Sequence, residues 1–63
     1  MLPYQDRVVE EKSDLDSNIE KLANFIESTM FDDVEPEEQE RMANQLNVMR
    51  ELSDILGERI DNF

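Results

Sequence analysis

The sequence has neither cysteine nor histidine, and only one glycine, two prolines and six basic residues occur among its 63 positions. Without cysteine and histidine, histidine-assisted serine catalysis, cysteine catalysis and the usual zinc sites are excluded. A single glycine cannot form a glycine-rich phosphate-binding loop. A chain this short, without disulfides or metal ligands, has few ways to stabilise one domain other than association with further chains.

Acidic residues outnumber basic ones by seventeen to six, which gives a net charge of −11. This charge repels nucleic-acid phosphates and anionic membrane surfaces, so we expect no direct DNA binding and no membrane partner. No apolar run approaches the ~20 residues of a membrane span, and the start of the chain has none of signal-peptide length. We therefore expect a cytoplasmic protein, in which any anionic ligand meets a local basic cluster.

The first half of the chain has the heptad spacing of one long amphipathic helix. Its apolar seam consists of Val8, Leu15, Ile19, Leu22 and Ile26. Pro3 suits a first helical turn, where its missing N–H would be unpaired anyway. The pattern predicts a helix over about residues 3–30.

A turn over residues 31–36 separates this helix from a second one. Pro36 disfavours helical geometry at Glu35 and suits the first position of a helix over about residues 36–62. The seam of this second helix, interrupted by Ser53, consists of Met42, Leu46, Met49, Leu56, Ile60 and Phe63. The sequence therefore predicts an all-α single domain over residues 1–63, an antiparallel two-helix hairpin.

Further apolar residues lie beside the two seams, so the apolar faces are wider than one partner helix can cover. These residues are Val9, Phe25, Val48, Leu52 and Ile55. One hairpin buries too little apolar surface to offset the entropy of ordering about 60 residues. We therefore predict a homo-oligomeric helical bundle with these five residues in the interface between chains.

The end of the hairpin that holds both termini combines aromatic and basic residues. Antiparallel pairing brings Tyr4, Arg7 and Lys12 close to Arg59 and Phe63. In one interpretation, the arginines donate to phosphates while Tyr4 stacks on a base, which suits a small nucleotide. In the other, the arginines pair with neighbouring carboxylates and the aromatic residues cap the core.

Two residues break the helical patterns. Lys12 stands on the apolar seam, where an apolar residue is expected. It either fixes the register between chains, contacts a ligand, or lays its stem along the seam while its ammonium reaches Asp16. Gly57 costs about 1 kcal/mol relative to alanine in a helix interior. It indicates close approach of another helix or a ligand, or is simply tolerated.

The acidic run at the turn permits alternative functions. It consists of Asp32, Asp33, Glu35, Glu37, Glu38 and Glu40. The run lacks the ligand spacing and the glycine of a calcium loop, so we expect no metal and no cofactor. It is also typical of an acidic nucleic-acid mimic, an anti-CRISPR-like inhibitor that binds a host defence protein. A purely structural oligomerisation module is the third interpretation.

Catalysis is not expected, although the carboxylates could in principle supply an acid–base pair. General acid–base catalysis needs a desolvated carboxyl group with a shifted pKa. A hairpin this thin has no interior in which to desolvate one, so we predict a protein that is not an enzyme.

Both helices resemble those of short phage-encoded helical-hairpin proteins. The likeness is carried by residues 4–12, Leu15, residues 19–22 and 25–26 in the first helix, and by residues 45–46, Met49 and residues 53–60 in the second. The chain resembles the domain shared by phage anti-CBASS and anti-Thoeris proteins, sponges that sequester cyclic nucleotide signals of bacterial immunity.

The resemblance implies a homo-oligomer, specifically a hexamer, in the cytoplasm of an infected bacterial host. Cyclic dinucleotides or related signalling nucleotides would be held between hairpins of neighbouring chains, and no reaction would be catalysed. It places ligand contacts at Tyr4, Arg7 and Lys12, near the start of the first helix. We add the neighbouring Val8 and Arg59 to this predicted ligand-binding set.

Overall fold

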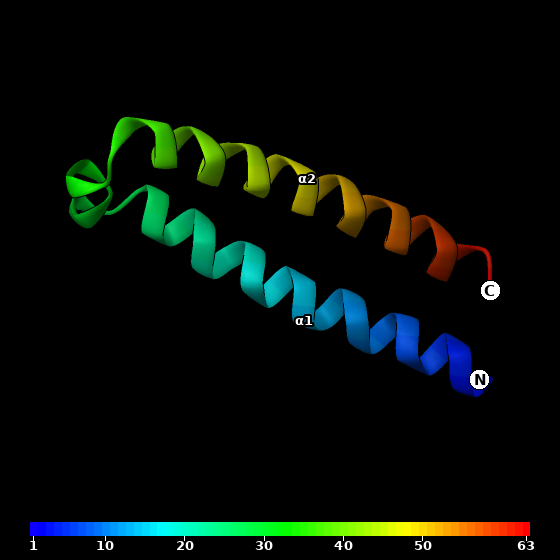
Figure 1. Cartoon of the computed structure of the whole chain (residues 1–63). Helices are drawn as coiled ribbons and strands as arrows, with labels where there is room; N and C mark the ends of the chain where they lie inside the picture. Colours follow the sequence, from blue (N-terminus) through cyan, green and yellow to red (C-terminus); the bar gives the residue numbers. More distant parts are fainter.

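The computed structural model describes all of residues 1–63 and contains two α-helices joined by a short 3-10 helix. Helix α1 spans Pro3–Ile26, the 3-10 helix η1 spans Thr29–Asp33, and α2 spans Pro36–Asp61. The two long helices run antiparallel, so that both termini lie at one end of the molecule and η1 at the other (Figure 1). The prediction of an all-α hairpin is thereby confirmed for the single chain.

Helix α1 ends at Ile26, four residues earlier than the heptad pattern predicts. Ser28 has extended backbone angles, φ −82° and ψ 161°, and its hydroxyl donates a 2.6 Å hydrogen bond to the Phe25 carbonyl. Side-chain hydroxyls that satisfy a nearby carbonyl in this way compete with continued helix. The apolar spacing did not locate this break, because Met30, four residues beyond Ile26, would also lie near the seam of a longer helix.

Each long helix begins at a proline, as the sequence predicts. At the start of α1, the Leu2 backbone N–H donates to the Gln5 side-chain oxygen at 2.9 Å. At the start of α2, the Gln39 side-chain nitrogen donates to the Phe31 carbonyl at 2.7 Å. This second bond ties η1 to α2 and fixes the geometry of the turn.

The hydrophobic core is a narrow seam between the helices. Its buried apolar residues are Val8, Leu46 and Leu56, and Ser53 is the fourth buried residue of the chain. The molecule measures 45 × 14 × 13 Å with a radius of gyration of 14.4 Å. A compact domain of this length would have a radius of gyration of roughly 11 Å. The hairpin is therefore elongated and buries few side chains by itself.

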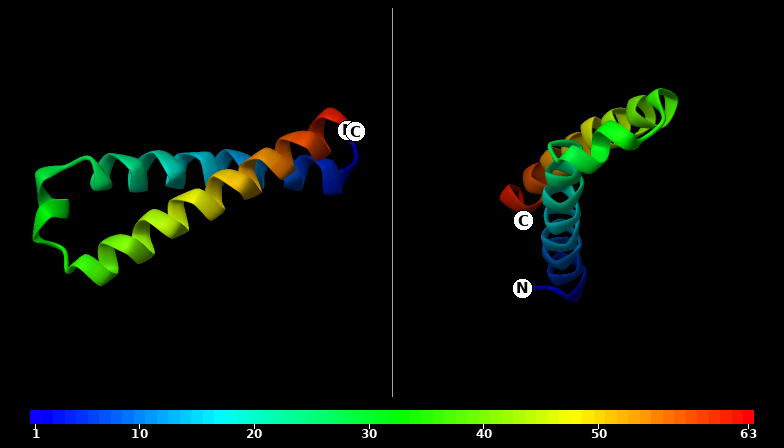
Figure 2. Two further views of the ribbon diagram at one scale, coloured as in Figure 1. Left: turned by 90° about the horizontal axis from the view of Figure 1, so that it is seen from above. Right: turned by 90° about the vertical axis from the view of Figure 1, so that its left-hand side faces the viewer.

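The helix axes are inclined to each other rather than parallel, and seen from above they cross near the end that holds the termini (Figure 2). At the opposite end they diverge, and η1 connects them. Phe25, near the end of α1, packs edge-on against Phe31 of η1 with ring centroids 6.3 Å apart. This aromatic pair closes the core beside the turn.

Four of the five residues predicted to lie between chains are exposed in the single hairpin. Val48, Ile55, Leu52 and Val9 keep 62%, 52%, 41% and 39% of their surface accessible. Phe25 differs, because its contact with Phe31 leaves it half-buried. The exposed side chains are available to another chain, and the interface itself stays a prediction.

Candidate functional site

Lys12 is the centre of a small polar network between the helices. Its Nζ donates to Asp16 Oδ2 at 2.9 Å and to Ser53 Oγ at 2.8 Å. The Ser53 hydroxyl in turn donates to Asp16 Oδ1, which closes a triangle of three polar groups. The ammonium therefore reaches Asp16, as one interpretation of the sequence held, and it also bridges to α2.

This network explains why Ser53 interrupts the apolar seam of α2. Sequence reasoning treated Lys12 and Ser53 as two separate departures from the heptad pattern and missed that they contact each other. A signal was available, because antiparallel pairing from the turn places both residues near the same level of the hairpin. A buried hydroxyl needs a hydrogen-bond partner, and the seam lysine supplies it.

The Ser53 hydroxyl, and then the Lys12 ammonium, hold the pKa of Asp16 below its ordinary value of 3.8. Both groups donate hydrogen bonds to the ionised carboxylate and therefore favour it over the protonated form. Asp16 is thus negative at neutral pH and neutralises Lys12 locally. An ammonium has three N–H donors, so Lys12 keeps one for any ligand.

Gly57 lies beside the stem of Lys12. A Cβ atom added to Gly57 would lie 3.4 Å from Lys12 Cε, an ordinary van der Waals distance, and it would meet nothing closer. Within the hairpin, the neighbour of the glycine is therefore a flexible lysine side chain rather than a tightly packed helix.

The end of the hairpin that holds the termini brings Tyr4 onto Phe63. The ring centroids are 5.9 Å apart and the planes are inclined by 77°, an edge-to-face arrangement. The pair caps the seam, yet Tyr4 and Phe63 keep 49% and 40% of their surface accessible. A planar ligand can therefore still reach the aromatic pair.

Arg7 and Arg59 form no ion pair, although neighbouring carboxylates are plentiful. The two salt bridges of the chain join Lys12 to Asp16 and Arg41 to Glu38. Both guanidinium groups are thus free for a ligand or another chain. Val8, by contrast, is buried in the seam with 6% of its surface accessible, so the single hairpin itself covers this predicted ligand contact.

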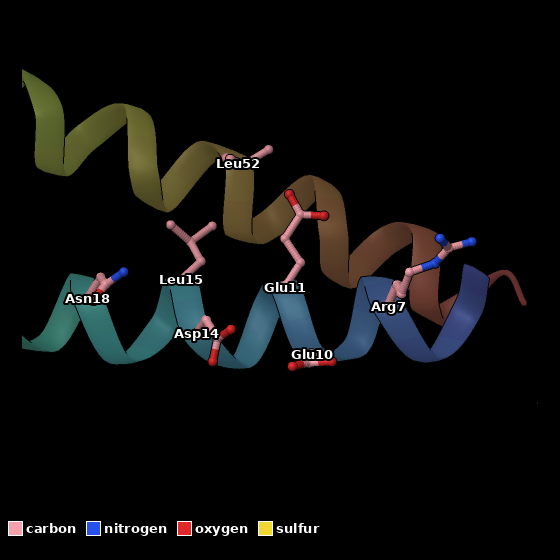
Figure 3. Close-up of a pocket in the computed structure, with 7 residues that line it drawn as sticks. All are labelled: Arg7, Glu10, Glu11, Asp14, Leu15, Asn18 and Leu52. Atoms are coloured by element: carbon pink, nitrogen blue, oxygen red, sulfur yellow. The ribbon is translucent and has the colours of Figure 1, made fainter. Parts of the chain in front are cut away.

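An open groove of about 420 Å³ runs along one side of the hairpin (Figure 3). It is lined by Arg7, Glu10, Glu11, Asp14, Leu15, Asn18 and Leu52. Leu15 and Leu52 provide its apolar part, whereas its polar lining on α1 includes three carboxylates but only one guanidinium. Of the predicted ligand-binding residues, only Arg7 lines this groove, and an anion is favoured only at its Arg7 end.

No three histidine, cysteine, aspartate or glutamate side chains lie close enough together to hold a metal ion. Neither helix combines the length and the apolar character that crossing a membrane requires.

The fold and these contacts define a small helical hairpin with an exposed apolar stripe and unpaired arginines. Residues 2–62 match the Sequestin family, and the chain belongs to this family. The chain is also 40% identical over 63 residues to an uncharacterised 7.5 kDa protein from the denB–rIIB intergenic region of Enterobacteria phage T4. That alignment covers the whole chain and 98% of the phage protein.

No solved structure matches the chain. The family match and the phage relative confirm the family resemblance that the residues of the two helices indicated.

Proposed function

We propose that this protein sequesters a cyclic nucleotide signal of bacterial immunity and does not cleave it. The family name denotes sequestration, and the relative in phage T4 supports a role during infection, in the cytoplasm of the bacterial host. The observation that carries the proposal is the pair of arginines without ion pairs, Arg7 and Arg59, at the same end as Tyr4.

The two arginines lie on the same side of the hairpin. Arg7 lines the groove together with Leu52. Arg59 follows Leu52 by seven residues, which is close to two full turns of helix, so both project from the same side of α2. Two guanidinium groups on different helices can each donate forked hydrogen bonds to a phosphate, while the exposed Tyr4 ring can stack on a base.

Not all of the predicted ligand residues contribute equally to this proposal. Lys12 has one N–H left after its bonds to Asp16 and Ser53, which allows one further contact. Val8 is assigned to the core instead. The proposed contacts are therefore Tyr4, Arg7 and Arg59, with Lys12 in a supporting position.

The net charge of −11 opposes an anionic ligand at long range. Salt screens that field beyond ~8 Å, so contacts with the arginines decide affinity at short range. Association of several hairpins would bring more arginines to one pocket. The proposal therefore includes a homo-oligomer, for which the resemblance to phage sponges implies a hexamer.

Calorimetric titration with a panel of cyclic di- and trinucleotides and cyclic ADP-ribose-type ligands tests the proposal. We expect one class to bind at micromolar concentrations or below, and chromatography of the released ligand to recover it intact. Arg7→Gln and Arg59→Gln should each weaken binding about tenfold or more, since each removes charged hydrogen bonds. The control variant is Arg50→Gln, which removes an arginine that is also exposed and unpaired but lies on the opposite side of α2 from Leu52. This variant should bind the ligand as the parent does. Absence of binding across the panel would contradict the proposal.

A further inference from the structure

Phe63 contacts Tyr4, the one aromatic side chain among the proposed ligand contacts. The ring centroids are 5.9 Å apart and the ring planes are inclined by 77°. In an edge-to-face pair, one ring presents an edge and the other ring presents one face. Tyr4 therefore keeps at least one of its two faces outside the contact with Phe63. Its exposed fraction of 49% agrees with a free face.

Tyr4 lies in the first turn of α1, where the chain itself confines a side chain poorly. Helix ends fray, and their residues have fewer neighbouring turns to pack against. The two residues before Pro3 give little cover, since Met1 and Leu2 are 79% and 57% exposed. The contact with Phe63, from the other helix, therefore adds confinement that the start of α1 lacks.

Phe63 is itself held in place, although it follows the end of α2. Its backbone N–H donates to the Ile60 carbonyl at 3.2 Å. The preceding residue, Asn62, donates from its side-chain nitrogen to the Glu58 carbonyl at 2.7 Å. Both bonds satisfy carbonyl groups that the end of a helix leaves without partners. The backbone that carries the Phe63 ring is therefore fixed to the last turn of α2.

We infer that Phe63 is a positioning residue, which confines the Tyr4 ring so that its free face can stack on a base of the ligand. The inference rests on the proposed function, because it requires a nucleotide base at Tyr4. Binding to a loose ring includes the entropy cost of immobilising that side chain. A ring already confined by Phe63 loses less freedom when the base arrives, so affinity rises without a contact between Phe63 and the ligand.

A role as a mere cap of the core makes a different demand on position 63. The buried apolar residues of the seam are Val8, Leu46 and Leu56, whereas Phe63 is 40% exposed. A cap at such a place needs apolar bulk, which leucine also supplies. The edge-to-face attraction needs a ring. Replacement of Phe63 by leucine therefore separates positioning from capping.

The mobility of the Tyr4 ring can be measured without any ligand. Tyr4 is the only tyrosine and the chain has no tryptophan, so the intrinsic fluorescence comes from this one ring. Phe63→Leu should lower the fluorescence anisotropy of Tyr4. The matched control is Phe31→Leu, the same change in the other edge-to-face pair, which should leave the anisotropy as in the parent. An anisotropy that Phe63→Leu does not change would overturn the inference, whatever the protein binds.

Calorimetric titration with the panel of cyclic nucleotides, including cyclic di-AMP and cyclic tri-AMP, measures the consequence for binding. Phe63→Leu should weaken binding about fivefold, the cost of immobilising one side chain. Phe63→Tyr keeps a ring and should bind within about twofold of the parent. Tyr4→Leu removes the stacking itself and should weaken binding about tenfold or more. In the Tyr4→Leu protein, Phe63→Leu should cost less than about twofold further, because no ring remains to be positioned.

Phe31→Leu should bind as the parent does, and circular dichroism and light scattering check that every variant keeps its helix content and mass. Equal binding by Phe63→Leu and the parent would overturn the positioning role and leave the proposed function intact. So would a loss that keeps its full size in the Tyr4→Leu protein, since Phe63 would then contact the ligand directly. A parent that binds no member of the panel would contradict the proposed function, and the inference with it.

Discussion

Lys12 of α1 and Ser53 of α2 are joined by a hydrogen bond of 2.8 Å between Nζ and Oγ across an otherwise apolar seam. Each residue alone would be a defect, since a cation or a hydroxyl in a seam loses hydration. Together with Asp16 they satisfy one another, and no buried side-chain donor or acceptor in the chain lacks a partner. The pair favours one register, because sliding either helix by a turn would set Lys12 or Ser53 against apolar residues.

Replacement of Ser53 by alanine should destabilise the protein. The change removes the bond from Lys12 and the bond to Asp16, and it leaves the Lys12 ammonium with Asp16 alone. We expect the free energy of unfolding to fall by about 1 kcal/mol. Urea denaturation at one fixed protein concentration measures it, because association also contributes to stability. Ser17→Ala, at an exposed serine of the same hairpin, is the control. Equal stability of the two variants would show that the triangle contributes nothing.

Replacement of Asp16 by asparagine should alter the dependence of stability on pH. The folded state holds the pKa of Asp16 below its ordinary value of 3.8, mainly through Ser53 and then through Lys12. A carboxyl group with a lowered pKa stabilises the fold above its unfolded pKa, and this contribution is lost as pH falls through the folded pKa.

The parent should therefore be more stable than Asp16→Asn at pH 7, and the difference should shrink below about pH 4. Comparison of the two proteins removes the effect of the other sixteen acidic residues, which they share. Denaturation curves from neutral to acidic pH measure the difference. A difference in the free energy of unfolding that stays constant down to pH 2 would mean that the carboxylate charge does not stabilise the contact.

The two-helix architecture could be predicted from sequence because both helices have strong heptad patterns and each starts at a proline. The end of α1 could not be predicted from sequence. It depends on the Ser28 hydroxyl, which donates to the Phe25 carbonyl, and on Gln39, which holds η1. Neither contact leaves a periodic signal in the sequence. Exposure of Val48, Leu52 and Ile55 followed from their place beside the seam.

The sequence predicted several residues of the candidate site, but it did not predict how their side chains are arranged. The meeting of Tyr4 and Phe63 followed from antiparallel pairing. Whether Arg7 and Arg59 are neutralised depends on side-chain rotamers, which spacing does not fix, and the structure leaves both unpaired. Val8 was placed among the ligand contacts because of its neighbours in sequence, whereas its position on the seam buries it.

Replacement of Gly57 by alanine should stabilise the hairpin. Glycine in a helix interior is less favourable than alanine by up to about 1 kcal/mol. The added methyl group would meet only Lys12 Cε, at 3.4 Å, and the lysine stem can adjust. A higher midpoint of thermal unfolding, again at fixed protein concentration, would confirm this. A lower midpoint would instead indicate that a helix of another chain packs closely on Gly57 in the assembly.

Replacement of Leu52 by aspartate should disrupt self-association much more strongly than the same change at Val9. The two side chains are matched in exposure, at 41% and 39%, and neither is part of the buried seam, so both variants keep the hairpin core. They differ in surroundings, since Leu52 lies between the exposed Val48 and Ile55 on α2, whereas no other exposed large apolar residue of α1 shares the side of Val9. An aspartate in place of Leu52 would be desolvated in an interface that buries this apolar patch, which should weaken association by about 100-fold or more. Light scattering coupled to size-exclusion chromatography gives the mass of each variant, and circular dichroism checks that helix content is retained. A Val9→Asp protein that dissociates while Leu52→Asp stays assembled would place the contact on the other side of the hairpin.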